Sequence, residues 1–181
     1  MEELAYIIND KWDKWDPDTM HYAMYVIDGT DIITRKDSGS NPYSFGTKLV
    51  NSGIAIWRFK IIKPLYYWVG IKDNKTIKKD AQGIDSDVGT FCIGRSSTRY
   101  CNDSKYKTTE GYKGKHVRFE NIDDVLCMIL NLNKKTLLYS VNNGPFQTAF
   151  HKLDTSKSYR MCLSLEANAK VDLVASVHLN R

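Results

Sequence analysis

The chain is predicted to fold as an all-β protein, a sandwich of two antiparallel sheets. Two observations carry this prediction. Residues 125–132, 136–141, 147–150, 159–165 and 171–177 are short runs rich in apolar and β-branched residues, separated by polar turns. The turn signal Asn142-Asn143-Gly144 lies between two of these runs. Many short strands at this spacing are typical of a sandwich.

The first part of the chain adds further strands. Residues 22–27 and 31–34 flank Asp28-Gly29, a hairpin turn signal. Residues 53–62 have apolar side chains on both faces, so a central position in a sheet is expected. Residues 66–71 and 90–93 are shorter apolar runs. The polar segments 35–48, 72–89 and 102–117 are expected to be loops.

The N-terminus has a different pattern. Five apolar residues recur at helical spacing, namely Leu4, Ile7, Ile8, Trp12 and Trp15. We therefore predict an amphipathic helix over residues 3–15 that packs on the body of the domain. Asp16-Pro17 is expected to end it. The predicted division is thus an N-terminal helical segment over residues 1–18 and one β-sandwich domain over residues 19–181.

Composition and charge narrow the range of possible functions. The 181 residues are 42% hydrophobic and carry a formal net charge of +5, from 26 basic and 21 acidic residues. A folded protein without a nucleic-acid partner is expected, because its basic residues are interspersed with acidic ones. The exceptions are residues 75–79 and 105–115, two basic clusters that are interpreted as solvated loops, with a weak polyanion contact as the alternative. No apolar run is long enough to cross a membrane, and the start Met-Glu-Glu-Leu lacks the features of a signal peptide. An intracellular, cytoplasmic monomer that does not bind membranes is expected.

The cysteines and histidines indicate no catalytic or metal centre. Cys127 and Cys162 lie in apolar runs and are expected to be buried thiols. Cys92 and Cys101 lack the close pairing of zinc ligands. The four histidines are scattered, and no phosphate-binding loop or nucleophile elbow is present. We therefore expect no enzymatic activity, no cofactor and no metal. Trp57, Trp68, Phe91 and Phe146 are expected in the core.

Several segments, in order, resemble the SPRY (B30.2-like) domain family over roughly residues 20–177. The matching residues are Ser52-Gly53 with Trp57-Arg58-Phe59, Trp68-Val69-Gly70-Ile71, Asp124-Val125 with Leu130-Asn131, Thr136-Leu137-Leu138-Tyr139, Asn143-Gly144 and Ala149-Phe150. The N-terminal pattern with Trp15-Asp16-Pro17-Asp18 is similar to the SPRY/SOCS-box branch. The sequence given ends at Arg181, so a SOCS box is not expected in it. The resemblance implies a bent, concanavalin-like jelly roll whose loops bind a peptide or a protein surface.

In that branch the domain selects a target and the box recruits a ubiquitin ligase. The resemblance thus implies an adaptor, with a ubiquitin-ligase component or a larger scaffold on another chain as a partner. Four positions of the branch's peptide pocket carry other residues here: Thr34, Lys36, Ser38 and Glu166. The identity of the ligand is therefore expected to differ from that of the branch.

The resemblance places the candidate binding residues in loops at one end of the sandwich. They are Thr34, Arg35, Lys36, Asp37, Ser38, Lys72, Asp73, Asn74, Tyr100, Glu166, Ala167 and Asn168. Backbone groups in such loops hold an extended peptide and side chains select it. The alternative is a lectin-like sandwich that binds glycans on exposed aromatic rings, with Tyr66, Tyr67 and Tyr100 as candidates.

Overall fold

The computed structural model describes residues 9–36, 42–64, 67–77, 89–94, 99–101 and 118–180, without the side chains of Arg99 and Tyr100. Within these ranges the chain forms strands and one short 3₁₀ helix, η1. The strands are β1 (Met24–Val26), β2 (Ile32–Arg35), β3 (Tyr43–Phe45), β4 (Ile54–Lys63), β5 (Tyr67–Asp73), β6 (Thr90–Gly94), β7 (Arg99–Cys101), β8 (Val125–Asn131), β9 (Thr136–Val141), β10 (Gln147–Phe150), β11 (Tyr159–Leu165) and β12 (Lys170–Leu179). Helix η1 spans Asn74–Thr76.

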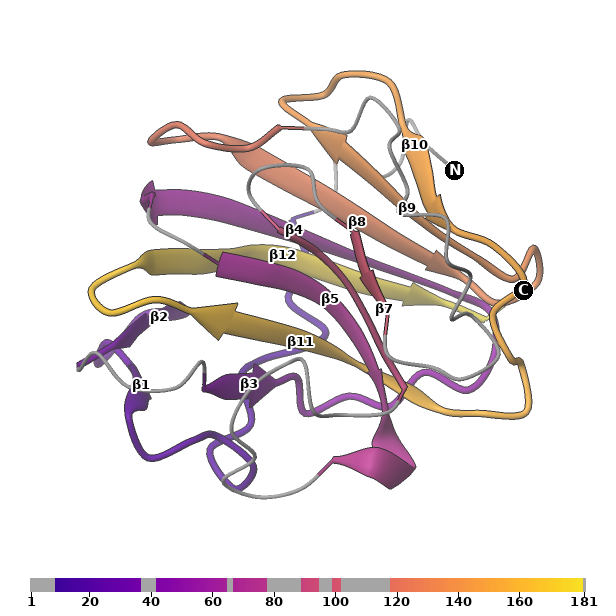
Figure 1. Ribbon diagram of the computed structural model, residues 1–181, viewed down its shortest axis with the longest axis horizontal. Helices are drawn as coiled ribbons and strands as arrows, with labels where there is room; N and C mark the ends of the chain where they lie inside the picture. Colours follow the sequence, from indigo (N-terminus) through magenta and orange to yellow (C-terminus); the bar gives the residue numbers. More distant parts are fainter. Residues whose placement is uncertain are drawn as a thin grey trace.

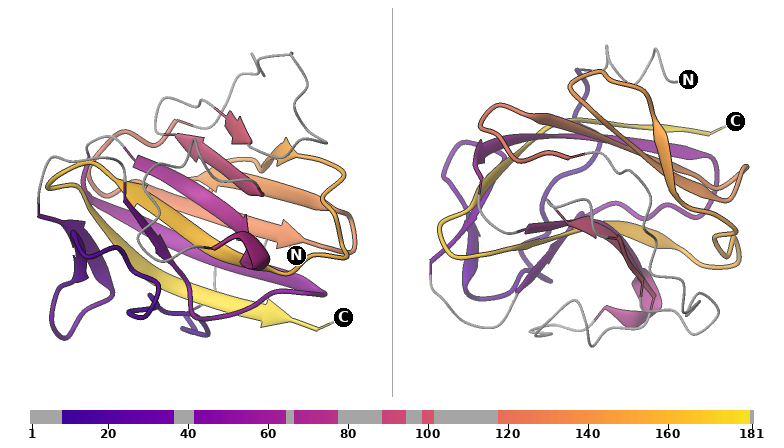
Figure 2. Two further views of the ribbon diagram at one scale, coloured as in Figure 1. Left: turned by 60° about the horizontal axis from the view of Figure 1, so that its bottom comes forward. Right: turned by 45° about the horizontal axis from the view of Figure 1, so that its top comes forward.

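The strands form two antiparallel sheets that face each other. The large sheet has the order β1-β2-β12-β4-β8-β9-β10, and the small sheet has the order β3-β11-β5-β6-β7. The two layers are visible in Figure 1 and, from another side, in the right panel of Figure 2. The chain crosses between the sheets several times, and the connection between β11 and β12 is the last of these crossings. The predicted fold class is therefore confirmed.

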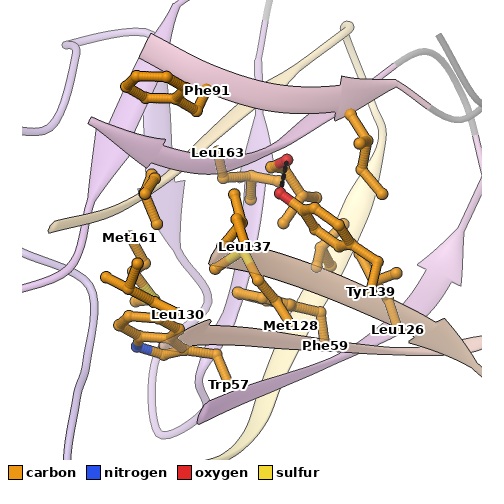
Figure 3. Packing of buried hydrophobic residues seen from close by; sticks show 14 of the residues in the cluster. Trp57, Phe59, Phe91, Leu126, Met128, Leu130, Leu137, Tyr139, Met161 and Leu163 are labelled. Atoms are coloured by element: carbon orange, nitrogen blue, oxygen red, sulfur yellow. Dashed lines mark hydrogen bonds between the residues drawn. The ribbon is translucent and has the colours of Figure 1, made fainter. Parts of the chain in front are cut away.

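Most of the core lies between the two sheets. Strand β4 contributes Trp57 and Phe59, and its neighbour β8 contributes Leu126, Met128 and Leu130, all with 0% exposure. Tyr139 in β9 reaches across the core, where its hydroxyl donates to the carbonyl oxygen of Val69 at 3.2 Å (Figure 3). Packing of this kind excludes water from both inner faces and supplies most of the driving force for folding.

The outer faces of both sheets also carry apolar clusters. On the large sheet Ile56, Cys127, Ile129 and Ala175 are buried. This explains why both faces of residues 53–62 are apolar, and β4 indeed lies between β12 and β8, in the interior of its sheet. Phe146, predicted as a core strand residue, precedes β10 and packs only partly buried against this outer cluster.

A second outer cluster covers the small sheet. It consists of Tyr43, Phe45, Trp68, Cys92 and Cys162. Cys92 and Cys162 flank Gly70 in the register of the three strands β6, β5 and β11, and their sulfur atoms are 3.4 Å apart. Burial raises the pKa of the Cys92 thiol, and it raises the pKa of Cys127 to about 12. The predicted buried thiols at Cys127 and Cys162 are confirmed.

The N-terminal helix prediction is wrong for the residues that can be compared. Residues 1–8 lie outside the described residues, and residues 9–15 form no helix. Lys11 instead forms a parallel bridge with Ser176 of β12, and Trp15 an antiparallel bridge with Gly46. The ring centroid of Trp12 lies 6.5 Å from that of Trp57 and 4.9 Å from that of His178. The conformation of this segment is thus determined by backbone pairing with Ser176 and Gly46, although its tryptophans have helical spacing.

Two buried carboxylates hold this segment. Asp13 accepts hydrogen bonds from Trp57 Nε1 and the backbone N–H of Lys48, at 2.9 and 3.0 Å. Asp16 pairs with Arg160 Nη1 at 2.7 Å and accepts from the Thr19 hydroxyl at 2.9 Å. Burial raises the pKa of Asp13, whereas burial of Asp16 is outweighed by its hydrogen bonds and by Arg160, which together lower its pKa.

The lowered pKa of Asp16 predicts a pH dependence of stability. Its contribution is present above the unfolded pKa and is lost as the pH falls through the folded pKa, because the unfolded chain then binds the proton more readily. Between about pH 5 and pH 2, Asp16→Asn should therefore lose less stability on acidification than the wild type. Urea unfolding across this range measures it, with Asp18→Asn as the exposed control. Parallel curves for wild type and Asp16→Asn would contradict the assignment.

Other differences from the predicted elements lie in the expected loops. Strand β3 falls within the segment 35–48, and Lys72 and Asp73 extend β5 beyond the predicted end at residue 71. Strand β7 was not predicted. Each missed strand segment is short or polar, and polar residues in a strand give no apolar signal. The segment 102–117 lies outside the described residues.

Candidate functional site

The connection between β11 and β12 is a tight turn. The backbone N–H of Ala169 donates to the carbonyl oxygen of Glu166 at 3.1 Å, and Asn168 has a φ of 65°. Asparagine tolerates this left-handed conformation better than most residues do. Glu166 and Asn168 are consequently exposed at the tip of a rigid turn.

Strand β2 holds this turn from the side. Thr34 Oγ1 donates to the carbonyl oxygen of Ala169 at 2.8 Å, and Arg35 Nη1 donates to that of Leu165 at 3.1 Å. In return, the backbone N–H of Asn168 donates to the carbonyl oxygen of Arg35 at 3.1 Å. Thr34 and Arg35 are only 2% and 3% exposed. These two predicted site residues therefore position the turn and offer almost no surface to a partner.

Further accessible side chains at this end come from β1, from the residues just before it and from the residue after β2. Lys36 is exposed, and its ammonium group lies 4.9 Å from the ring centroid of Tyr25, a cation–π distance. Tyr22 is 74% exposed and its ring contacts that of His21 in a tilted arrangement, with ring centroids 4.2 Å apart. We call this region, Tyr22–Tyr25 with Thr34–Lys36 and Glu166–Asn168, the β11–β12 end. It lies at the left of Figure 1.

The other predicted group, Lys72 to Asn74, lies at the opposite end of the sandwich. Strand β11 pairs with β5 so that Leu165 faces Tyr67 and Tyr159 faces Asp73. The six steps of β5 separate these two ends by about 20 Å. The sequence grouped all of these residues at one end, but the antiparallel register separates them.

At the opposite end, two of the three candidate residues are buried and stabilise the fold. Lys72 has 0% exposure, and its ammonium group contacts Thr90 Oγ1 at 3.3 Å. Asp73 is 4% exposed, accepts a hydrogen bond from the backbone N–H of Lys75 at 3.1 Å, and pairs with Lys157 at 3.5 Å. It thereby caps η1. Asn74 is half-buried in that helix.

The remaining candidates are Asp37, Ser38, Tyr100 and the other two tyrosines of the glycan alternative. Asp37 and Ser38 lie outside the described residues, as does Tyr66. Tyr100 is in β7, but its side chain is outside the description. Tyr67, one candidate for a glycan platform, has 0% exposure and donates its hydroxyl hydrogen bond to the carbonyl oxygen of Phe119. It therefore belongs to the core and offers no ring to a sugar.

Sequence reasoning missed the aromatic part of the β11–β12 end. The sequence predicts Tyr22 and Tyr25 only as residues of a strand. Strand β1 lies at the edge of the large sheet, so its outer side pairs with no other strand of the described chain. Aromatic residues at an edge were the available signal, but their exposure depends on the sheet order, which the sequence does not state.

Neither a metal centre nor a membrane span is found in the ranges that the structure covers. No group of three or more metal-binding side chains gathers among the residues described. None of the helical structure in those same ranges has the length and hydrophobicity that crossing a bilayer requires.

No protein-family model and no curated protein sequence matches this chain. Solved structures do match. The SPRY domain of human HERC1 superposes with a TM-score of 0.67 at 19% identity, covering 89% of this chain and 97% of that one. The TRIM65 PSpry domain gives a TM-score of 0.67 at 10% identity, covering 94% of both chains. Stonustoxin gives a TM-score of 0.65 at 18% identity, and the match covers 91% of this chain and 27% of the stonustoxin chain. The chain therefore has the fold of the SPRY domains.

Proposed function

We propose that the protein is a non-enzymatic interaction module that binds a peptide or protein surface at the β11–β12 end. The observation that carries this proposal is a fixed turn with exposed aromatic and charged side chains beside it. Buried Thr34 and Arg35 fix a rigid turn, and exposed Tyr25, Lys36 and Glu166 stand beside it. A rigid scaffold that presents aromatic and charged side chains loses little entropy on binding. SPRY domains in general act as interaction modules, which supports the proposal.

The geometry favours an extended ligand. Strand β1 is at the edge of its sheet, and the bonds from Lys36 N–H to Ala23 oxygen and from Ile27 N–H to Ile32 oxygen fix its register. In an antiparallel pair, backbone groups of alternate residues point away from the neighbouring strand. The carbonyl oxygen of Met24 and the backbone groups of Val26 thus face the open edge, where an added strand would pair.

We propose that the partner is a target or scaffold protein within the cell. A component of a ubiquitin ligase on another chain is one such partner. The four cysteines, all within the described residues, form no disulfide, as expected in a reducing compartment. A glycan partner has less support because Tyr67 is buried.

Affinity purification with quantitative mass spectrometry tests the proposal. A variant with Tyr25, Lys36 and Glu166 changed to alanine should lose most of any specific partner that wild type recovers. The loss is expected because three accessible contacts are removed at once, and central aromatic contacts often cost tenfold or more each. The matched control changes Lys75, Lys134 and His151, exposed residues away from this end, to alanine. Equal recovery by both triple variants would refute the proposed site.

A further inference from the structure

Three lysines on or directly beside the large sheet have no counter-charge among the described residues. Lys170 of β12 stands opposite Lys63 of β4 and opposite Thr34 of β2, beside a register shift between Lys170 and Val171. Lys36 follows Thr34 by two residues and so extends the same side of β2. In the part of the chain that the structure describes, none of these lysines makes an ion pair. We call Lys36, Lys63 and Lys170 the lysine row.

The neighbouring row of the same sheet is balanced. Lys60 pairs with Asp123 at 2.8 Å, and Lys11 forms an ion pair with Asp31. Asp172 stands opposite Lys60 in register, and the cations that act on its pKa are Lys11 and Lys60 rather than members of the lysine row. Among the described residues, the sheet therefore neutralises its charges in one row and leaves them uncompensated in the next.

An uncompensated lysine pair has a cost. Like charges directly opposite each other on adjacent strands destabilise a sheet, and their Cβ atoms are about 5 Å apart. An anion shared by both ammonium groups would turn this repulsion into attraction. The row also borders the β11–β12 end, because Thr34 bonds to Ala169 next to Lys170 and Lys36 contacts Tyr25.

We propose that the lysine row binds a phosphate monoester on the partner segment, so that the module recognises a phosphorylated peptide. A phosphate carries a charge of about −2 and three acceptor oxygens, which matches two ammonium groups, whereas a carboxylate neutralises only one. Lysine is an established point-charge ligand for phosphate. Tyr25 would contact the peptide beside the phosphate. This inference rests on the proposed function, since it names the ligand of the same end.

An NMR titration of the ¹⁵N-labelled protein tests it with three pentapeptides: Ala-Gly-phosphoserine-Gly-Ala and its serine and glutamate counterparts. The phosphopeptide should shift the amides of Thr34, Lys63 and Lys170 and bind about tenfold more tightly than the glutamate peptide. Lys63→Gln with Lys170→Gln should remove about tenfold of that affinity. The control pair Lys48→Gln with Lys134→Gln, exposed at other places, should change nothing.

The alternatives give distinct results. Equal affinity for the glutamate peptide would replace phosphate by carboxylate as the ligand. Tighter binding of a mixed-sequence DNA oligonucleotide would indicate a general polyanion surface. If the phosphopeptide shifts none of these amides, the lysine row is not its binding site. In every one of these cases the phosphopeptide inference fails.

A ligand-free measurement tests the repulsion itself. Lys63→Gln should raise the Tm by about 1–2 °C at low salt, because it removes the like-charge pair, and the gain should shrink at high salt. No gain would overturn the claim that the pair is uncompensated.

The failure of this inference can be told apart from that of the proposed function. If phosphatase treatment of the lysate leaves partner recovery unchanged while the Tyr25, Lys36 and Glu166 variant still abolishes it, the phosphate inference fails and the proposed function stands. If that variant recovers its partners as wild type does, the proposed function fails.

Discussion

Replacing Gly70 with alanine is expected to lower the free energy of unfolding by about 3 kcal/mol. Gly70 lies between Cys92 and Cys162 at the centre of the small sheet. A Cβ atom there would lie 2.0 Å from the carbonyl oxygen of Phe91 and 2.6 Å from the sulfur of Cys92. The first of these atoms belongs to the backbone, so the strands themselves must move to make room.

The effect should extend to the candidate site, because β5 fixes the position of β11. A shift at Gly70 displaces Cys162 and, three residues later, Leu165, whose carbonyl oxygen accepts the hydrogen bond of Arg35. Denaturant unfolding measures the stability. Gly144→Ala is the control, because its Cβ would only approach the carbonyl oxygen of Val141 at 3.0 Å; we expect a cost of about 1 kcal/mol or less. Equal stability of the two variants would contradict the packing described for β5.

Replacing Asp13 with alanine is also expected to destabilise the protein by about 3 kcal/mol. Asp13 is 2% exposed and accepts from Trp57 Nε1, from the backbone N–H groups of Lys14 and Lys48, and from the Thr47 hydroxyl. Its removal leaves the buried Trp57 Nε1 and three partly buried donors without their acceptor. The cost of burying the carboxylate itself, which raises its pKa, offsets part of the loss.

Two measurements separate this effect from general unfolding. Denaturant titration gives the change in stability, and hydrogen exchange should show faster exchange of the Trp12 amide, which bonds to Ser176. Asp18→Ala, at an exposed position of the same segment, should change stability by less than about 0.5 kcal/mol. Wild-type stability of Asp13→Ala would show that the carboxylate does not hold the N-terminal segment.

Strands with a strong apolar pattern could be predicted from the sequence. The bounds of β9, β10 and β11 agree with the predicted ranges 136–141, 147–150 and 159–165. The segment around Trp12 and Trp15 could not, since its helical spacing gives no sign of the bridges to Ser176 and Gly46. Local periodicity records which side of a segment is apolar, but a bridge depends on where a distant strand leaves its backbone unpaired.

The candidate site could be predicted only in part. The resemblance predicts Lys36 and Glu166 at the same end, and the structure brings their segments together through Arg35, Leu165 and Asn168. The same prediction includes Asp73, yet the register of β5 with β11 puts Asp73 at the other end. The lysine row was missed because Lys63 and Lys170 are far apart in sequence and meet only through the pairing of β4 with β12.

Cross-linking mass spectrometry of the protein bound to its recovered partner tests the location of the binding surface most directly. Exposed or half-exposed lysines lie at the β11–β12 end or next to it, namely Lys36, Lys63 and Lys170, and away from it, namely Lys75, Lys134 and Lys152. An amine-reactive linker therefore samples both regions in one experiment. We expect cross-links to the partner from Lys36 and Lys170. Cross-links only from Lys75, Lys134 and Lys152 would contradict a binding surface at the β11–β12 end.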